Sequence, residues 1–242
     1  MTYETLIVER RGPVGWLTFN RPGAGNAMDA TMLRELEEAW LELDADPDAL
    51  REQSRRTKRA ELRLSAWHNG VWKPVIAAVN GVCAGGGLHF VADADIVIAA
   101  SSATFLDPHV SIGQVAAYED IALVLKSPME AVMRMALTGR HERLTAARAH
   151  QLGILSQVVE PPDDLTDVAQ ALAEKIARNS PAAMEATKKA LWGALEMGLT
   201  DACRAGAREL VSMWGHPDQT EGPLAFAEKR EPVWTLPTRS AR

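Results

Sequence analysis

Three consecutive glycines, at positions 85–87, constrain the fold of this chain more than any other feature of its sequence. They lie in the stretch VNGVCAGGGLHFVADADIVIA, residues 79–99, where apolar residues precede and follow them. Each glycine in a regular element costs about 1 kcal/mol relative to alanine. A strand that turns here into a helix would direct several bare backbone N–H groups to one side. The stretch therefore predicts either a backbone site for a ligand oxygen or a tight crossing of strand and helix.

Composition and charge predict a cytoplasmic globular protein that binds neither nucleic acid nor membrane. The 242 residues are 47% hydrophobic and carry a net charge of −6, whereas phosphate binding needs clustered lysine and arginine. The one basic run, 51–59, is interpreted as the solvated face of a helix. No apolar run has the 18 or so residues that a transmembrane helix needs, and the N-terminus resembles no signal peptide. Cys83 and Cys203 form no disulfide or metal pattern, so we expect no metal site.

The hydrophobic patterns predict an α/β half, 1–160, followed by an all-helical region, 161–242. Strands are expected around a Gly-Pro turn within 5–20, at 74–81, at 95–99 and at 155–160, with a short strand or extended loop at 103–110. Helices are expected at 30–43 (capped by Asp29), 48–67, 86–94, 118–125, 128–139 and 145–153, then at 163–178, 181–197, 200–214 and 218–229. Exposed-looking apolar residues of the helical region suggest packing against a second subunit.

Residues 73–105, KPVIAAVNGVCAGGGLHFVADADIVIAASSATF, resemble the signature of the crotonase superfamily, also called the enoyl-CoA hydratase/isomerase family. The resemblance extends in the same order through VGWLTFNRP (14–22), LTGRHERLTAARAHQLGILSQVV (137–159) and EGPLAFAEKREPVW (221–234). It implies a crotonase-like spiral of ββα units with a helical C-terminal trimerisation region, and homotrimers or dimers of trimers. It also implies acyl-CoA thioester substrates, with coenzyme A as part of the substrate and no permanently bound cofactor.

The resemblance further implies that the thioester oxygen is held between two backbone N–H groups, which stabilise a developing enolate. Matched by position, one of these donors is Gly86, and Gly85 and Gly87 belong to the same coenzyme A site. Lys229 matches a C-terminal lysine that lies near the coenzyme A phosphates in this family. A solvated lysine at the end of a helix is the alternative interpretation for Lys229.

Two histidines stand where hydratases of this family have glutamates. One glutamate normally follows the glycines by two residues, and the other ends a Phe-x-x-Pro-Glu pattern; here these positions are His89 and His109. Imidazole, with a reference pKa of about 6.5, is a competent acid or base at neutral pH. Asp107 is placed to orient the ring of His109, or to cap a turn. Glu119 is a candidate base, and a surface glutamate is the alternative; both histidines have the alternative of ordinary buried side chains.

A core strand and the loop that supplies the second oxyanion N–H are missing by comparison with the family. About 25 residues are expected between the helix that ends near 43 and the helix before KPVIAAVNG. The sequence LELDADPDALREQSRR, 41–56, instead passes from helix to helix, so the gap falls near 44–51. Three explanations stay open: a natural deletion, an engineered change, or a sequence that joins residues on either side of an omitted loop. A true deletion would remove one donor, which is worth about 3 kcal/mol.

Three functions follow from these features. The first is a hydratase or isomerase of acyl-CoA in which His89 and His109 transfer protons. The second is a C–C or thioester hydrolase, because a two-histidine site is suited to activating water and the Asp-Pro-His step resembles a segment of the β-diketone hydrolases of the family. The third is a catalytically impaired acyl-CoA-binding subunit, which the missing segment favours.

Overall fold

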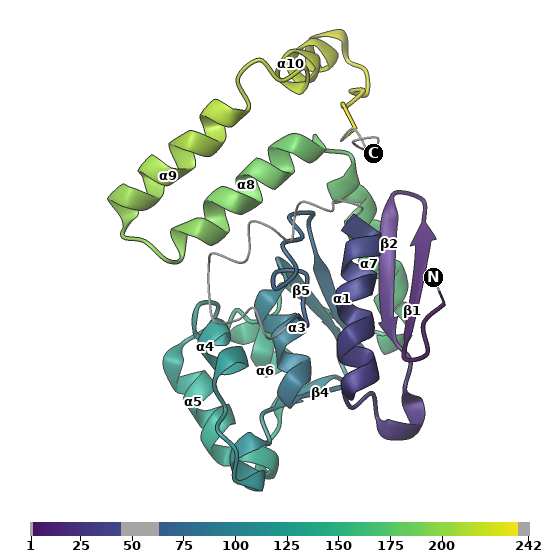
Figure 1. Cartoon of the computed structure of the whole chain (residues 1–242), viewed down its shortest axis with the longest axis vertical. Helices are drawn as coiled ribbons and strands as arrows, with labels where there is room; N and C mark the ends of the chain where they lie inside the picture. Colours follow the sequence, from purple (N-terminus) through teal and green to yellow (C-terminus); the bar gives the residue numbers. More distant parts are fainter. Residues whose placement is uncertain (1, 45–62, 237–242) are drawn as a thin grey trace. The chain divides into compact units, whose positions relative to one another are not determined.

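The computed structural model describes residues 2–44 and 63–236, and these residues form two compact units (Figure 1). The first unit comprises Met1–Val71 and Val75–Ala173, and the second comprises Trp72–Pro74 and Glu174–Arg242. These units are defined by contacts alone, so the predicted domain boundary between residues 160 and 161 stays a prediction. No helix within the described ranges has both the length and the apolar character that crossing a bilayer requires.

The first unit begins with the predicted hairpin and helix. Strands β1 (Leu6–Arg11) and β2 (Val14–Phe19) pair in antiparallel register. Helix α1 (Ala30–Asp44) begins where predicted, because the Asp29 carboxylate accepts a hydrogen bond from the Met32 N–H at 2.9 Å. The inner face of α1 is buried against the first strand and Leu64, and this cluster holds the hairpin on the helix.

Two further three-stranded sheets form the centre of the first unit. In the first sheet, β5 lies between β3 and β8 and all strands are parallel; in the second, β6 pairs with β4 in parallel and with β7 in antiparallel register. Their bounds are β3 Ile76–Val79, β4 Val82–Ala84, β5 Ile96–Ala100, β6 Thr104–Leu106, β7 Leu144–Thr145 and β8 Gln157–Val159. The sequence did not predict β4 and β7, because strands of two or three residues show no alternation that could be recognised.

Helices surround these sheets at the positions expected. The glycines form a 3₁₀ turn, Gly85–Gly87, which continues as the short helix α3. Helix α3 is Leu88–Asp93. The helices that follow it in this part of the chain are α4 (Tyr118–Val124), α5 (Met129–Thr138) and α6 (Ala146–Gln151). Helix α3 packs against α4, and the buried side chains of Leu88, Phe105 and Leu123 join α3, β6 and α4 in one core. This packing brings the residues that follow the glycines next to the start of α4.

Helices dominate the end of the chain, as predicted. They are α7 (Leu165–Ala177), α8 (Pro181–Ala194), α9 (Leu199–Ser212) and α10 (Asp218–Glu228). Ser180 caps α8, since its hydroxyl accepts a hydrogen bond from the Ala183 N–H at 3.2 Å. Helices α8 and α9 pack side by side as a helical hairpin (Figure 1).

The predicted helix 48–67 is wrong at its C-terminal end, where residues 63–67 are not helical and residues 66–70 form a turn. The side chain of Ser65 accepts a hydrogen bond from the His68 N–H, and His68 Nδ1 accepts one from the Ser65 N–H, each at 3.3 Å. Such side-chain bonds compete with a continuing helix, and Gly70, at φ +71°, closes the turn. The rest of that helix, the basic run 51–59 and the gap predicted near 44–51 lie outside the described residues, apart from Asp44 itself.

Candidate active site

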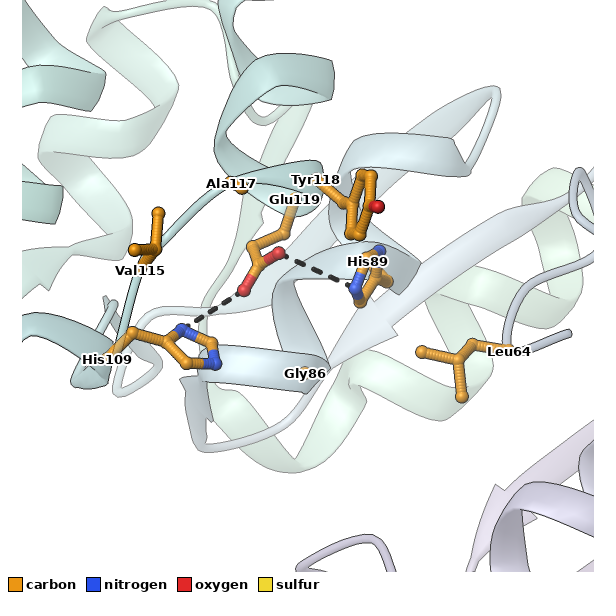
Figure 2. Close-up of a pocket in the computed structure, with 8 residues that line it drawn as sticks. All are labelled: Leu64, Gly86, His89, His109, Val115, Ala117, Tyr118 and Glu119. Atoms are coloured by element: carbon orange, nitrogen blue, oxygen red, sulfur yellow. Dashed lines mark ion pairs between the residues drawn. The ribbon is translucent and has the colours of Figure 1, made fainter. Parts of the chain in front are cut away.

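A pocket of about 450 Å³ lies beside the glycine turn in the first unit (Figure 2). Its lining combines a backbone segment, two imidazoles, a carboxylate, a phenol and small apolar side chains: Leu64, Gly86, His89, His109, Val115, Ala117, Tyr118 and Glu119. The residues come from four separate segments, namely the turn before β3, the glycine turn with α3, the 3₁₀ turn after β6, and the start of α4. The pocket therefore contains polar groups that only the tertiary fold brings together.

Backbone conformation and close packing favour glycine at the three positions. Gly85 has φ +49°, in the left-handed region. A Cβ atom added to Gly86 would lie 2.3 Å from Met28 Cε, and one added to Gly87 would lie 3.3 Å from Cys83 Sγ. The tight-crossing interpretation thus accounts for the glycines, whether or not a ligand also approaches them.

The same turn leaves a backbone donor at the pocket. The 3₁₀ turn begins at Gly85 after Ala84, and the Leu88 N–H donates to the carbonyl oxygens of Gly85 and Gly86, so the Gly86 N–H comes before the first bond within the turn. Gly86 itself lines the pocket. The second donor that the family resemblance implies would belong to the segment missing near 44–51, which lies outside the described residues.

Glu119 lies between the two histidines, as Figure 2 shows. Its Oε2 is 3.6 Å from His89 Nε2 and its Oε1 is 3.1 Å from His109 Nδ1. His89 is in the first turn of α3 and Glu119 in the first turn of α4, and both side chains are buried. The packing of α3 against α4 therefore couples the two imidazoles through one carboxylate.

Asp107 is a second carboxylate that contacts His109. Asp107 follows β6 and is fully buried, and its Oδ1 accepts the His109 N–H at 2.9 Å. The same oxygen lies 2.6 Å from His109 Nδ1. Because both neighbours of Nδ1 are carboxylates, we assign a proton to Nδ1. The second ring nitrogen of His109 is turned away from Glu119 in Figure 2, so it is free to act as an acceptor toward the pocket.

The structure thus brings together most of the predicted site residues. Gly86, His89, His109 and Glu119 line one pocket, and Asp107 contacts His109 directly. Lys229 belongs to the second unit, where it ends α10 with a φ of +54°. Its contact with coenzyme A stays a prediction.

Sequence reasoning missed Asp120, a buried carboxyl group one residue after Glu119. The pKa of Asp120 is raised to about 7, most of all by burial and then by the negative charges of Asp107 and Glu119, while His109 opposes them. Neither carboxylate oxygen of Asp120 has a hydrogen-bond partner among the described residues. An acidic residue in the first turn of a helix is ordinarily explained by the helix dipole, so no local pattern indicates this role.

A second missed group lies behind His89. The His68 ring meets the His89 ring edge to face, with centroids 5.5 Å apart. The Ser65 hydroxyl donates to Asp93 Oδ2 at 2.7 Å and lies 2.9 Å from His68 Nδ1. All of these side chains are buried, so a hydrogen-bonded cluster supports His89 from below the pocket.

Two sets of three side chains are close enough to consider as metal ligands: Asp107, His109 and Glu119, and His68, His89 and Asp93. Atoms bound to one metal ion at about 2.1 Å are about 3 Å or more apart. Asp107 Oδ1 and His109 Nδ1 are 2.6 Å apart, which is the spacing of a charge-assisted hydrogen bond. In the other set the Ser65 hydroxyl already bridges Asp93 and His68. We therefore describe both sets as hydrogen-bonded clusters, and the prediction of no metal site stays a prediction.

Comparison with known proteins extends over nearly the whole chain. A family model described as "Enoyl-CoA hydratase/isomerase" matches residues 50–237. A Mycobacterium bovis protein named "Probable enoyl-CoA hydratase" is 34% identical over 97% of this chain and 99% of its own length. "Carnitinyl-CoA dehydratase" of Salmonella arizonae is 32% identical over 96% and 98%. The crystal structure of an enoyl-CoA hydratase/isomerase from Mycobacterium paratuberculosis is 34% identical and has a TM-score of 0.84 over 96% of this chain and 98% of that one.

These similarities confirm the predicted fold class, a crotonase-like α/β core with a helical C-terminal region. The alignment with the Mycobacterium bovis protein extends over 258 residues, more than the 242 of this chain, so that relative has positions without a counterpart here. That difference agrees with a missing segment. Its predicted place near 44–51 stays a prediction.

Proposed function

This chain belongs to the enoyl-CoA hydratase/isomerase family, and from that premise we propose that it hydrates or isomerises an acyl-CoA thioester with imidazole acid and base groups. The observation that carries the proposal is the position of Glu119 between His89 and His109 in the pocket beside Gly86. His89 and His109 stand at the positions of the two glutamates in the family pattern. Glu119 supplies a carboxylate to the same pocket.

In the proposed hydration, the thioester oxygen accepts a hydrogen bond from the Gly86 N–H. His109, oriented by Asp107, takes a proton from water through its second ring nitrogen, and the water oxygen bonds to the β-carbon. The electron pair of the double bond moves onto the thioester, and the N–H dipole stabilises the enolate. His89 and Glu119 then supply one proton to the α-carbon. Water is thereby added across the double bond. The protein gains one proton at His109 and gives up one from His89 and Glu119, so its total number of protons does not change.

Hydration of crotonyl-CoA, followed by loss of the enoyl absorbance, tests this proposal. We expect turnover by the wild-type protein and at least about a hundredfold lower kcat in His109→Ala. Acyl-CoA binding without any turnover would instead support the impaired binding subunit that the missing second donor favours.

The contact between Asp107 and His109 favours a second candidate, a C–C or thioester hydrolase. A carboxylate 2.6 Å from an imidazole, with the other ring nitrogen turned to a pocket, is also an arrangement that activates water against a carbonyl carbon. Release of free thiol from an acyl-CoA without loss of an enoyl band would identify thioester hydrolysis. A new carboxylate product from a β-diketone would identify C–C hydrolysis.

We further propose that the protein is a cytoplasmic homotrimer or dimer of trimers that binds coenzyme A only as part of its substrate. Large apolar side chains of the helical region support a subunit interface, since Leu191, Leu199 and Trp214 are 66%, 81% and 73% exposed in the single chain. Light scattering of the purified protein measures its mass directly. A monomer in solution would contradict this part of the proposal.

A further inference from the structure

Three buried carboxyl oxygens behind His109 have no hydrogen-bond donor among the described residues. They are Asp107 Oδ2 and both oxygens of Asp120. Asp107 is fully buried and Asp120 is 7% exposed. An ionised carboxylate that loses water without gaining donors is strongly destabilised. The simplest way to satisfy these oxygens is to protonate one carboxyl group so that it becomes a donor to the other.

The charges around Asp120 point the same way. Asp107, after β6, and Glu119, on α4, face it with negative charge, and His109, in the 3₁₀ turn, faces it with positive charge. With all three carboxyl groups ionised, this buried cluster would carry three negative charges, which a neutral His109 does not offset and an imidazolium would offset by only one. Protonation of Asp120 removes one of the three. The raised pKa of Asp120, which burial and these charges cause, supports this assignment.

We propose that Asp120 is a positioning residue, protonated in the working protein, that donates a hydrogen bond to Asp107. Asp107 then holds His109 through Oδ1 and the Asp120 proton through Oδ2. The effect on turnover rests on the proposed function, in which His109 is the base. The proton shared by Asp120 and Asp107 does not depend on that function. Ionisation of Asp120 removes the hydrogen bond to Asp107 and places two like charges against each other, so Asp107 no longer holds His109 in its working position. Turnover should therefore fall in alkaline solution, where a simple histidine base would give a plateau.

Infrared spectroscopy of protein labelled with ¹³C-aspartate detects the proton without any assay of activity. At pH 6, aspartates with ordinary pKa values near 4 are ionised, so we expect one protonated carboxyl band that disappears on titration through about pH 7. The band should be absent in Asp120→Asn and Asp120→Ala, and present in Asp163→Asn, a control at an exposed aspartate. Absence of the band from the wild type, or its survival in Asp120→Asn, would overturn the proposal. The wild-type titration remains decisive if a variant does not fold.

Kinetics then separate positioning from a merely structural role. Asparagine keeps the shape of Asp120, donates an N–H and does not ionise, so Asp120→Asn should keep kcat near the wild-type value at pH 6.5 and lose the alkaline fall. Asp120→Ala supplies no donor, and we expect about tenfold lower kcat with little change in KM. Equal alkaline falls in the wild type and Asp120→Asn would contradict the role. A clear infrared band in a protein that turns over no acyl-CoA would refute the proposed function and leave the shared proton established.

Discussion

The contact between Gly86 and Met28 allows a direct test of why the turn contains glycine. In Gly86→Ala, the added Cβ would lie 2.3 Å from Met28 Cε, whereas carbon atoms in contact are about 3.5–4.0 Å apart. Met28 Cε is the end of a flexible side chain that is half-buried against the cluster of Leu6, Met32 and Leu36, so the side chain must turn aside and lose part of this packing. Overpacking costs about 1–3 kcal/mol, and a flexible neighbour places this case at the lower end. We expect Gly86→Ala to lower the free energy of unfolding by about 1 kcal/mol.

A double-mutant cycle with Met28→Ala isolates this contact. Met28→Ala removes the obstructing methyl group and should cost about 1–2 kcal/mol, because the side chain is only partly buried. In that background Gly86→Ala should cost close to nothing, which gives a coupling energy of about 1 kcal/mol. Urea unfolding followed by circular dichroism measures all four proteins. An equal cost of Gly86→Ala with and without Met28 would show that this contact is not the reason for the glycine.

Activity of the same proteins decides whether the substrate also needs the bare backbone. Alanine keeps the N–H at position 86, so the double variant should retain turnover within a few-fold if only the N–H dipole acts on the thioester. Gly86→Pro removes the donor and should lower kcat at least about a hundredfold. If the folded double variant were as inactive as Gly86→Pro, a Cβ atom itself would obstruct the substrate, and our assignment to packing alone would be refuted.

Three further predictions concern single side chains. His109→Ala should lower kcat at least about a hundredfold with little change in the urea midpoint; equal losses of both would make His109 a packing residue. Burial raises the pKa of Glu35, but hydrogen bonds from the Glu4 and Thr5 N–H groups, at 2.8 and 2.9 Å, outweigh it and the pKa is lowered. Ionised Glu35 thus stabilises the fold above its ordinary pKa of 4.5, and this stabilisation is lost in acid. Glu35→Gln should therefore lower the free energy of unfolding by about 1–2 kcal/mol at pH 7 and by less at pH 3. A difference that does not change with pH would contradict this. The raised pKa of Asp120 has the opposite effect, because the folded protein holds its proton more tightly than the unfolded chain does. The stability of the wild type should therefore fall as pH rises from about 4 to 7, by at most about 1.4 kcal/mol per pH unit. The slope should be smaller in Asp120→Asn, and an unchanged slope would exclude Asp120 as its source.

Local signals predicted the elements whose causes are local. The Gly-Pro turn between β1 and β2, and the Asp29 cap of α1, depend on residues within a few positions of one another. By contrast, β4 and β7 exist because neighbouring strands pair with them, and their own two or three residues contain no periodic pattern. The turn at 66–70 replaced the end of a predicted helix because the Ser65 and His68 side chains bond to the backbone, which a hydrophobic pattern does not report.

The candidate site shows the same division. A family pattern in the sequence placed His89 and His109, and the two-residue spacing indicated that Asp107 could orient His109. Glu119 was a weaker candidate, because its contact with both rings depends on the packing of α3 against α4. Asp120 was missed entirely, because its raised pKa comes from burial and from the charges of Asp107 and Glu119. Asp107 is distant in the sequence, and both residues were candidates for other roles.

The predicted exchange of two glutamates for two histidines would change the charge of the site less than the sequence suggests. Taken alone, it would remove two negative charges from the pocket. In the structure, Glu119 and Asp107 each lie within hydrogen-bond distance of His109, and Glu119 also reaches within 3.6 Å of His89. Negative charge is therefore still present next to both imidazoles. Under the proposed function, these carboxylates would orient the imidazoles, and the Gly86 N–H would be the group that stabilises the developing enolate.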